Sequence, residues 1–253
     1  MGRQRSQQTS RKLSHPYNHP SRPGTLFIVG MPIGAPDDLT LRARAILGQV
    51  SIVAAETPLA TRTLLDYHQI AANIIGYRQG DEEHIAVLLD RLNAGHDIAL
   101  VADCGMPVIY DPGRLLIAAA RACGHRVTVV PGPSALTAAA ALSGHSADRL
   151  LFVGRVPRTA QQLDRLLEEL SRETGTTVMF APASAVRRIL VGLRRLMPER
   201  TVTLAVDMTK PGERLYQGNA RSLLTGIRSL SKDSDVTLVL SAAKRTRPIA
   251  AGS

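Results

Sequence analysis

Four stretches of the sequence combine glycine and proline with polar side chains, which is typical of loops that bind polar small molecules. Glycine lets backbone amides approach a ligand closely, and proline fixes the shape of a loop. The amides of Ser134 and Ala135 also begin a predicted helix, where a carboxylate is favoured. Any one stretch could be an ordinary turn, so the predicted binding site depends on their combination: GMPIGAPDD (30–38), ADCGMPVIYDPG (102–113), PGPSA (131–135) and DMTKPGE (207–213).

Several common catalytic motifs are missing from the sequence. No GxGxxG follows the first predicted strand, and the chain has no Walker A lysine motif, no HExxH and no GxSxG. Hydride transfer, phosphoryl transfer, zinc hydrolysis and serine hydrolysis therefore lack their signatures. The two cysteines, Cys104 and Cys123, are too few for a disulfide framework or a zinc site, and we predict no metal site. We expect Cys104 to be a small buried filler.

The loops lie between short apolar runs and helical patterns that alternate along the chain. Such alternation predicts βαβ units, a parallel sheet and right-handed crossovers. In open α/β sheets, ligands bind outside the carboxyl ends of the strands, and all four loops fall at predicted strand ends. The strands predicted for the first half are 25–30, 50–55, 73–77, 97–103 and 126–132, with helices near 39–48, 58–67, 82–95, 112–123 and 133–144.

The second half predicts a different, mixed sheet. The strands 201–207 and 213–218 are separated only by a loop, which favours an antiparallel pair. We place the boundary near 145–149, so the predicted organisation is an N-terminal α/β domain at 24–146 and a C-terminal α/β domain at 147–244. The other strands predicted there are 150–154, 176–181 and 235–242, with helices at 158–171, between 181 and 201, and near 219–228.

The composition is that of a globular protein with a basic extension. Of the 253 residues, 44% are hydrophobic, which supports a sizeable core, and no apolar run is long enough to cross a bilayer. Residues 1–23 hold five basic and no acidic residues, and the formal net charge is +10, which indicates a polyanionic partner such as RNA. The basic tail could equally be a solubilising extension. We expect 1–23 to be disordered, 245–253 to be flexible, no membrane association, and a cytoplasmic location.

The loops together resemble a known set. The order GTLFIVGMPIGAPDDLTLRA, VSIVAAE, DIALVADCGMPVIYDPG and VVPGPSAL is similar to the tetrapyrrole methylase superfamily, most closely to its branch that methylates small-subunit ribosomal RNA. The likeness runs from about Thr25 to Lys244, and DRLLFVGRVPR and DMTKPGERLYQG extend it through the second half. It implies two α/β domains with S-adenosylmethionine in the cleft between them, usually in a homodimer. It also implies methylation of the ribose 2′-hydroxyl of a cytidine in small-subunit ribosomal RNA.

The resemblance also implies which residues hold the cofactor. Most come from the Gly/Pro-rich loops, and the remainder come from the second domain. By position, the cofactor-binding residues would be Ile33, Gly105, Met106, Pro107, Ile109, Ser134 and Ala135, with further contacts from Phe152, Ala181 and Thr209.

The sequence departs from this branch on the side that faces RNA. The glycines and prolines that shape the backbone are retained better than the polar side chains. Donor binding is therefore better supported than the ribose acceptor, and two alternatives stay open: a methylase of a small tetrapyrrole, and a paralogue that binds the cofactor without turnover. The altered positions include Thr57, Pro58 and Leu59 in place of Asp-Thr-Arg, Gln79, Gly80 and Asp81 in place of His-Asn-Glu, and Met106 in place of Thr.

Methyl transfer to a hydroxyl needs orientation of the acceptor and help in removing its proton. We predict Asp103 and Lys210 as the catalytic residues, because both follow strands at the loops described above. Lys210 could instead contact a phosphate or the acceptor oxygen. The other candidates for the base are Asp111, Asp207 and Glu56, although Asp111 could cap the following helix and Glu56 could be a solvated strand end.

Overall fold

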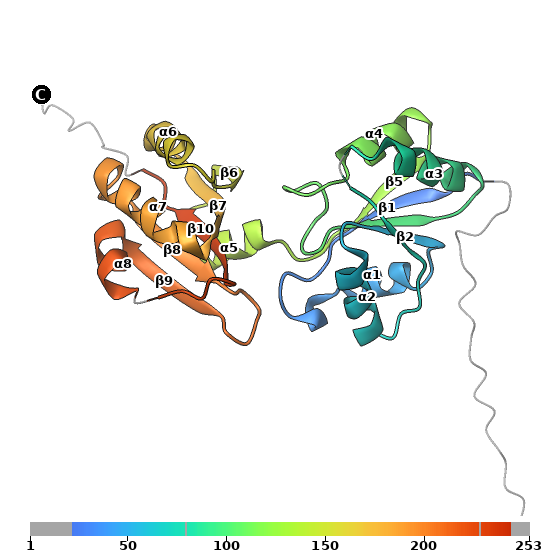
Figure 1. The fold of residues 1–253 in the computed structure, drawn as a ribbon, viewed down its shortest axis with the longest axis horizontal. Helices are drawn as coiled ribbons and strands as arrows, with labels where there is room; N and C mark the ends of the chain where they lie inside the picture. Colours follow the sequence, from blue (N-terminus) through green and yellow to red (C-terminus); the bar gives the residue numbers. More distant parts are fainter. Residues whose placement is uncertain (1–21, 79, 228, 244–253) are drawn as a thin grey trace, which may run out of the picture.

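The computed structural model describes residues 22–78, 80–227 and 229–243. The tails predicted at 1–23 and 245–253 lie outside these residues, apart from Arg22 and Pro23, and so does Gln79. Two five-stranded sheets divide the described chain, one on each side of Figure 1. The predicted architecture of two α/β units, the first with a parallel sheet and the second with a mixed one, is confirmed.

The first sheet is parallel and is covered by helices on both faces. Its strands are β1 (Thr25–Val29), β2 (Ile52–Ala55), β3 (Ile74–Gly76), β4 (Ile98–Val101) and β5 (Arg126–Val130), in the order β3-β2-β4-β1-β5. One face packs against α1 (Leu41–Leu47) and α2 (Pro58–Tyr67), and the other against α3 (Glu82–Asn93) and α4 (Arg114–Ala122). Burial on both faces explains why these strands are almost continuous apolar runs.

The second sheet is mixed, in the order β6-β7-β10-β8-β9. Its strands are β6 (Leu150–Arg155), β7 (Thr176–Pro182), β8 (Thr201–Val206), β9 (Arg214–Asn219) and β10 (Asp235–Leu240). Only β6 and β7 run parallel; the β7–β10, β10–β8 and β8–β9 pairs are antiparallel, as predicted for the last of these. One face is covered by α6 (Ala160–Ser171), α7 (Ala183–Leu196) and α8 (Ala220–Gly226).

The helix α5 (Ala135–Ser143) covers the other face of this second sheet, although it precedes the boundary that the sequence suggests. Its residues Ala139 and Ala140 are buried against Val178, Ala205 and Val239 of the second sheet. The chain therefore passes from the first sheet to the second along residues 131–134, between β5 and α5 (Figure 1). The small side chains of α5 let the helix lie close to the sheet. The boundary at 145–149 itself stays a prediction.

A buried arginine joins the ends of several elements of the second half. Arg200 is only 7% exposed, and its guanidinium donates to the carbonyl oxygens of Leu170, Glu173, Gly175 and Ser241 at 2.6–3.2 Å. These carbonyls lie in the last turn of α6, between α6 and β7, and just after β10. Because an arginine presents its donors in a rigid fork, one side chain can donate to carbonyls from several elements at once.

Candidate functional site

Three of the Gly/Pro-rich loops converge at the carboxyl edge of the first sheet. The strand β1 lies between β4 and β5, so the loops after these strands are neighbours. Met31 and Gly105 exchange backbone hydrogen bonds of 2.8 and 3.1 Å. A Cβ on Gly30 would lie 2.7 Å from the Cα of Gly132 and 2.6 Å from the sulfur of Met106. Only glycine fits at such a close approach of two backbones, so the convergence depends on these residue types.

The fourth loop, residues 207–213, meets the first loop across the seam between the halves. The Thr209 hydroxyl accepts a 2.8 Å hydrogen bond from the backbone N–H of Ala35. A Cβ on Gly34 would lie 2.5 Å from the carbonyl oxygen of Met208 and 2.5 Å from the Thr209 hydroxyl. Asp207 and Thr209 have φ of 52° and 63°, a region that costs non-glycine residues free energy and is often found at functional sites.

A cavity of about 290 Å³ lies where these loops meet the second sheet. Its apolar walls come from both halves and can accommodate an aromatic ring, while its polar side chains are concentrated on the second half. The first half contributes Ile33, Cys104 and Ala135, and the second contributes Arg155, Phe180, Ala181, Pro182, Met208, Lys210, Val236, Thr237 and residues 232–235.

The structure brings five of the ten predicted cofactor residues to this cavity or directly behind its wall. Ile33, Ala135 and Ala181 line it directly. Gly105 lies next to Ile33, since a Cβ on Gly105 would be 3.7 Å from the Ile33 side chain. Phe152 packs edge-on against Phe180, which lines the cavity, with the ring centroids 5.0 Å apart. Three of these positions line the cavity and two lie behind lining residues, and their contacts with a cofactor stay predictions.

The remaining predicted cofactor residues lie around the cavity without lining it. Met106 packs against Gly30, and Thr209 is bonded to Ala35. Pro107 is buried within its loop, Ile109 is 42% exposed, and Ser134 is the N-cap of α5. Their roles toward a cofactor stay predictions.

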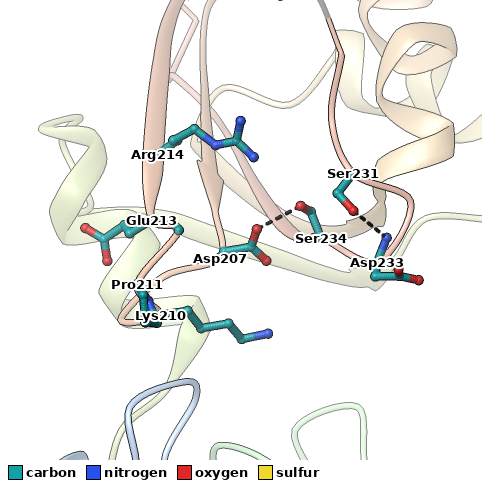
Figure 2. Close-up of a pocket in the computed structure, with 9 residues that line it drawn as sticks. Asp207, Lys210, Pro211, Glu213, Arg214, Ser231, Asp233 and Ser234 are labelled. Atoms are coloured by element: carbon teal, nitrogen blue, oxygen red, sulfur yellow. Dashed lines mark hydrogen bonds between the residues drawn. The ribbon is translucent and has the colours of Figure 1, made fainter.

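Lys210 lies between the cavity and a second, open pocket of about 600 Å³ in the second half, shown in Figure 2. Its ammonium donates to the Asp235 carboxylate at 2.6 Å, and this hydrogen bond raises the pKa of Lys210, which therefore stays a cation. In Figure 2, Lys210 and Arg214 extend on opposite sides of Asp207. The Asp207 carboxylate accepts bonds from the Ser234 hydroxyl and the Asp235 N–H at 2.7 and 2.9 Å, which fixes the loop.

Asp103 belongs to a group of carboxylates beside the cavity. It accepts hydrogen bonds from the N–H and the hydroxyl of Thr57 at 3.0 and 2.7 Å. Burial and the charge of Asp103 raise the pKa of Glu56. Burial, followed by the charges of Glu56 and Asp103, raises the pKa of Asp111 to about 6, although Arg155 opposes the shift. A carboxyl group with this pKa can accept a proton near neutral pH.

The raised pKa of Asp111 predicts a stability effect. In the unfolded chain its pKa is near 3.8, so the folded state binds the extra proton between about pH 4 and 6 and is destabilised above that range. We expect Asp111→Asn to stabilise the protein at pH 8, where the native carboxylate is charged, and to have no such effect near pH 4. Because solvent screens part of the charge, we expect a gain in the free energy of unfolding of only about 1–2 kcal/mol at pH 8. Urea unfolding at both pH values measures the difference. The exposed Asp90→Asn on α3 is the control, and an equal effect at both pH values would contradict the assignment.

The expectation that Cys104 is a buried filler is wrong. The residue is exposed and lines the cavity, because the loop turns at Gly105 with φ of 70° and directs Cys104 toward the second half. Partial desolvation of the sulfur and the charges of Asp111, Asp235 and Asp103 raise the pKa of this thiol. A raised pKa lowers the thiolate fraction, so Cys104 is poorly suited to act as a nucleophile.

Sequence reasoning missed the segment 232–237 and Arg155 as parts of the cavity wall. The strand β10 is antiparallel to both neighbours, so its first residues lie beside the carboxyl ends of β7 and β8; Asp235 pairs with Pro182 and Val236 with Val206. A search of carboxyl ends alone omits a strand that starts at the same edge. The sequence feature that could have indicated this wall is the polar run of serine, lysine and aspartate at 231–235, directly before the apolar strand.

The family model described as tetrapyrrole (corrin/porphyrin) methylases matches residues 25–224. The chain belongs to the tetrapyrrole methylase family. The matched range begins at β1 and ends in α8, so it includes every loop of the cavity except the segment before β10. The chain is therefore a methyltransferase by family.

Individual relatives of this methylase agree with the family match. The chain is 33% identical to a protein of Thermotoga maritima named ribosomal RNA small subunit methyltransferase I, over 86% of this chain and 98% of that protein. It is 37% identical to a Xylella fastidiosa protein of the same name, over 82% of this chain and 77% of that protein. A solved cobalt-precorrin-4 methyltransferase shares the fold, with a TM-score of 0.65 and 18% identity over 86% of this chain and 94% of that one.

No helix in the described part of this methylase has the length and apolar character needed to span a membrane.

Proposed function

We propose that the chain is an S-adenosylmethionine-dependent methyltransferase that modifies the ribose 2′-hydroxyl of a cytidine in small-subunit ribosomal RNA. The observation that carries the proposal is the single cavity into which the loops 30–38, 102–113 and 131–135 converge against the second sheet. The names of the relatives support the choice of ribosomal RNA as acceptor.

The residues of the cavity fit the proposed donor. Phe180, Ala181 and Val236 give an apolar wall suited to an adenine ring, and Ile33 and Ala135 face them from the first half. Ala135 also begins α5, where backbone amides favour a carboxylate. S-adenosylmethionine, when bound, supplies an activated methyl group, so the protein mainly has to orient the acceptor and receive its proton.

We assign these two tasks to a residue next to the cavity-lining Cys104 and to Lys210, which lines the cavity from the second half. Asp103 is our proposed base, since its Oδ1 and Oδ2 are held in place by Thr57; Asp111 is the alternative, because its pKa lies near 6. Lys210, a cation oriented by Asp235, is proposed to contact the acceptor oxygen or a neighbouring phosphate. In this arrangement the base removes the hydroxyl proton while the lysine holds the acceptor in line.

The experiment that tests the function compares acceptors directly. The purified protein is incubated with radiolabelled S-adenosylmethionine and either small ribosomal subunits that lack the ribose methyl or a uroporphyrinogen-type tetrapyrrole. We expect label in the ribosomal RNA, at a ribose identified by mass spectrometry, and none in the tetrapyrrole. Asp103→Asn is expected to lower the rate about 100-fold or more, as for loss of a general base.

The two alternatives give different results in the same experiment. Label in the tetrapyrrole alone would overturn the RNA assignment in favour of a small-molecule methylase. Donor binding by calorimetry with no label in either acceptor would indicate a paralogue that binds the cofactor without turnover. A protein that does not bind the donor would contradict the proposal entirely.

We further propose that the chain acts in the cytoplasm on RNA and forms a homodimer. The basic composition supports a polyanionic partner. The homodimer is what the resemblance to the family implies. Sedimentation analysis of the full chain distinguishes a dimer from a monomer.

A further inference from the structure

A tyrosine of the first half rests on the edge strand of the second half. Tyr110 lies in the loop 102–113, and Val108 and Tyr110 adopt φ of 75° and 71° there. It contacts Gly154 of β6, where the register with β7 shifts between Phe152 and Arg155. Gly154 has φ of 72°, and a Cβ on it would lie 2.7 Å from the Tyr110 ring. The Tyr110 ring can pack against β6 here because the strand is irregular at this point and Gly154 has no side chain.

The next residue of β6 places a cation over that ring. The guanidinium carbon of Arg155 lies 5.9 Å from the centroid of Tyr110, within the range of a cation–π interaction. Arg155 is exposed and also lines the cavity. It takes part in none of the ion pairs found among the described residues, whereas Lys210 of the same cavity is paired with Asp235. The positive charge of Arg155 is therefore available to a ligand.

The surroundings of Arg155 explain why a cation is needed at this place. The carboxylates of Glu56 and Asp103 act on Asp111 with the same sign of charge, and Arg155 acts on it with the opposite sign. An RNA backbone that approaches these three carboxylates is repelled unless a cation faces it. Arginine suits that task, because its planar fork binds a phosphate through two hydrogen bonds.

We propose that Arg155, held against the ring of Tyr110, binds a backbone phosphate next to the acceptor ribose. The inference rests on the proposed function and adds the residue that positions the substrate. Arg155 contacts the phosphate, and Tyr110 is a positioning residue that acts through Arg155. The other anion near the cavity, the carboxylate of the donor, is favoured instead at the start of α5, where Ala135 lines the wall.

The test measures binding of a fluorescently labelled small-subunit ribosomal RNA fragment by anisotropy across a range of salt concentrations. We expect Arg155→Gln to weaken RNA binding about tenfold and to reduce the slope of log affinity against log salt by about one. Arg155→Lys is expected to retain part of the affinity, Tyr110→Leu to weaken binding with a smaller change in slope, and Tyr110→Phe to bind like the wild type. Arg165→Gln, which removes the same charge from the exposed face of α6, is the matched control.

Calorimetry with S-adenosylmethionine separates the two anions. Because Arg155 also lines the donor cavity, we expect the donor affinity of Arg155→Gln to fall by clearly less than the roughly tenfold loss of RNA affinity. Unchanged RNA affinity and salt slope would overturn the proposal, as would weakened donor binding with unchanged RNA binding. If the RNA effect appears but no RNA is methylated, the phosphate contact stands and the proposed activity fails. A wild-type protein that binds no RNA overturns both.

Discussion

Gly34→Ala is expected to lower the affinity for S-adenosylmethionine at least tenfold while leaving each sheet folded. The new Cβ would lie 2.5 Å from the carbonyl oxygen of Met208 and 2.9 Å from the Cγ of Lys210. The atom of Met208 that the new Cβ would meet belongs to the backbone, which cannot rotate away as a side chain can. Thr209 is held at a φ of 63° by its hydrogen bonds to Ala35 and Glu213, so moving either residue costs free energy. The overlap therefore pushes the first loop away from the second half and opens the cavity. Isothermal calorimetry measures the loss, and about tenfold corresponds to 1.4 kcal/mol.

A second glycine of the same half provides the control for this change. A Cβ on Gly48, at the end of α1, would find its nearest neighbour at 3.5 Å, an ordinary contact. Gly48→Ala is thus expected to bind the donor like the wild type. Circular dichroism during heating checks that both variants are folded. Donor affinity unchanged in Gly34→Ala would show that the seam between the halves does not shape the donor site.

Arg200→Met is expected to destabilise the protein by about 3–5 kcal/mol, the largest stability effect among these predictions. The variant keeps most of the apolar stem but leaves the carbonyls of Leu170, Glu173, Gly175 and Ser241 without their charged donor. A carbonyl that is buried without a partner costs free energy, because in the unfolded chain water satisfies it. For a chain of this size the melting temperature should fall by roughly 10 °C.

The control for Arg200 is an arginine on the surface. Arg165 on α6 is exposed, and Arg165→Met is expected to change the stability by less than about 0.5 kcal/mol. Arg200→Lys should recover only part of the loss, since an ammonium group cannot reach all four carbonyls from one position. An Arg200→Met variant as stable as the wild type would mean that solvent already satisfies these carbonyls.

The fold was predictable because local pattern and global architecture agree at almost every element. The predicted strands 97–103 and 126–132 are largely apolar runs, the second of which ends at Pro131 and Gly132, and both are parallel strands of the first sheet. Four helices, α1, α4, α5 and α6, begin two residues after the predicted start. In α1 the reason is the cap: the helix begins after Thr40, whose side chain accepts from the N–H of Ala43, although the apolar pattern starts at Leu39. The packing of α5 on the second sheet was not predictable, since a run of alanine and leucine fits either neighbour equally.

The candidate site was predictable only where glycine and proline mark it. Gly30, Gly105 and Gly132 indicated a close approach of loops, and the structure places them together. The side-chain contacts between the two halves have no comparable pattern in the sequence. Nothing in the sequence around Arg155 pairs it with Tyr110, which is 45 positions away, and the bond between Thr209 and Ala35 joins residues 174 positions apart. Long-range contacts of this kind follow from the packing of two completed sheets.

The strand order of the second sheet also sets when the donor cavity can first exist during synthesis. β10 lies between β7 and β8, so a nascent chain that ends before residue 235 carries two strand edges facing an empty slot. The cavity wall formed by 232–237 arrives with the same segment. During synthesis the first sheet can therefore fold while the second sheet still lacks its central strand. Until β10 pairs with β7 and β8, the second sheet is incomplete and prone to misassociation. The donor cavity is therefore complete only after β10 has paired with β7 and β8.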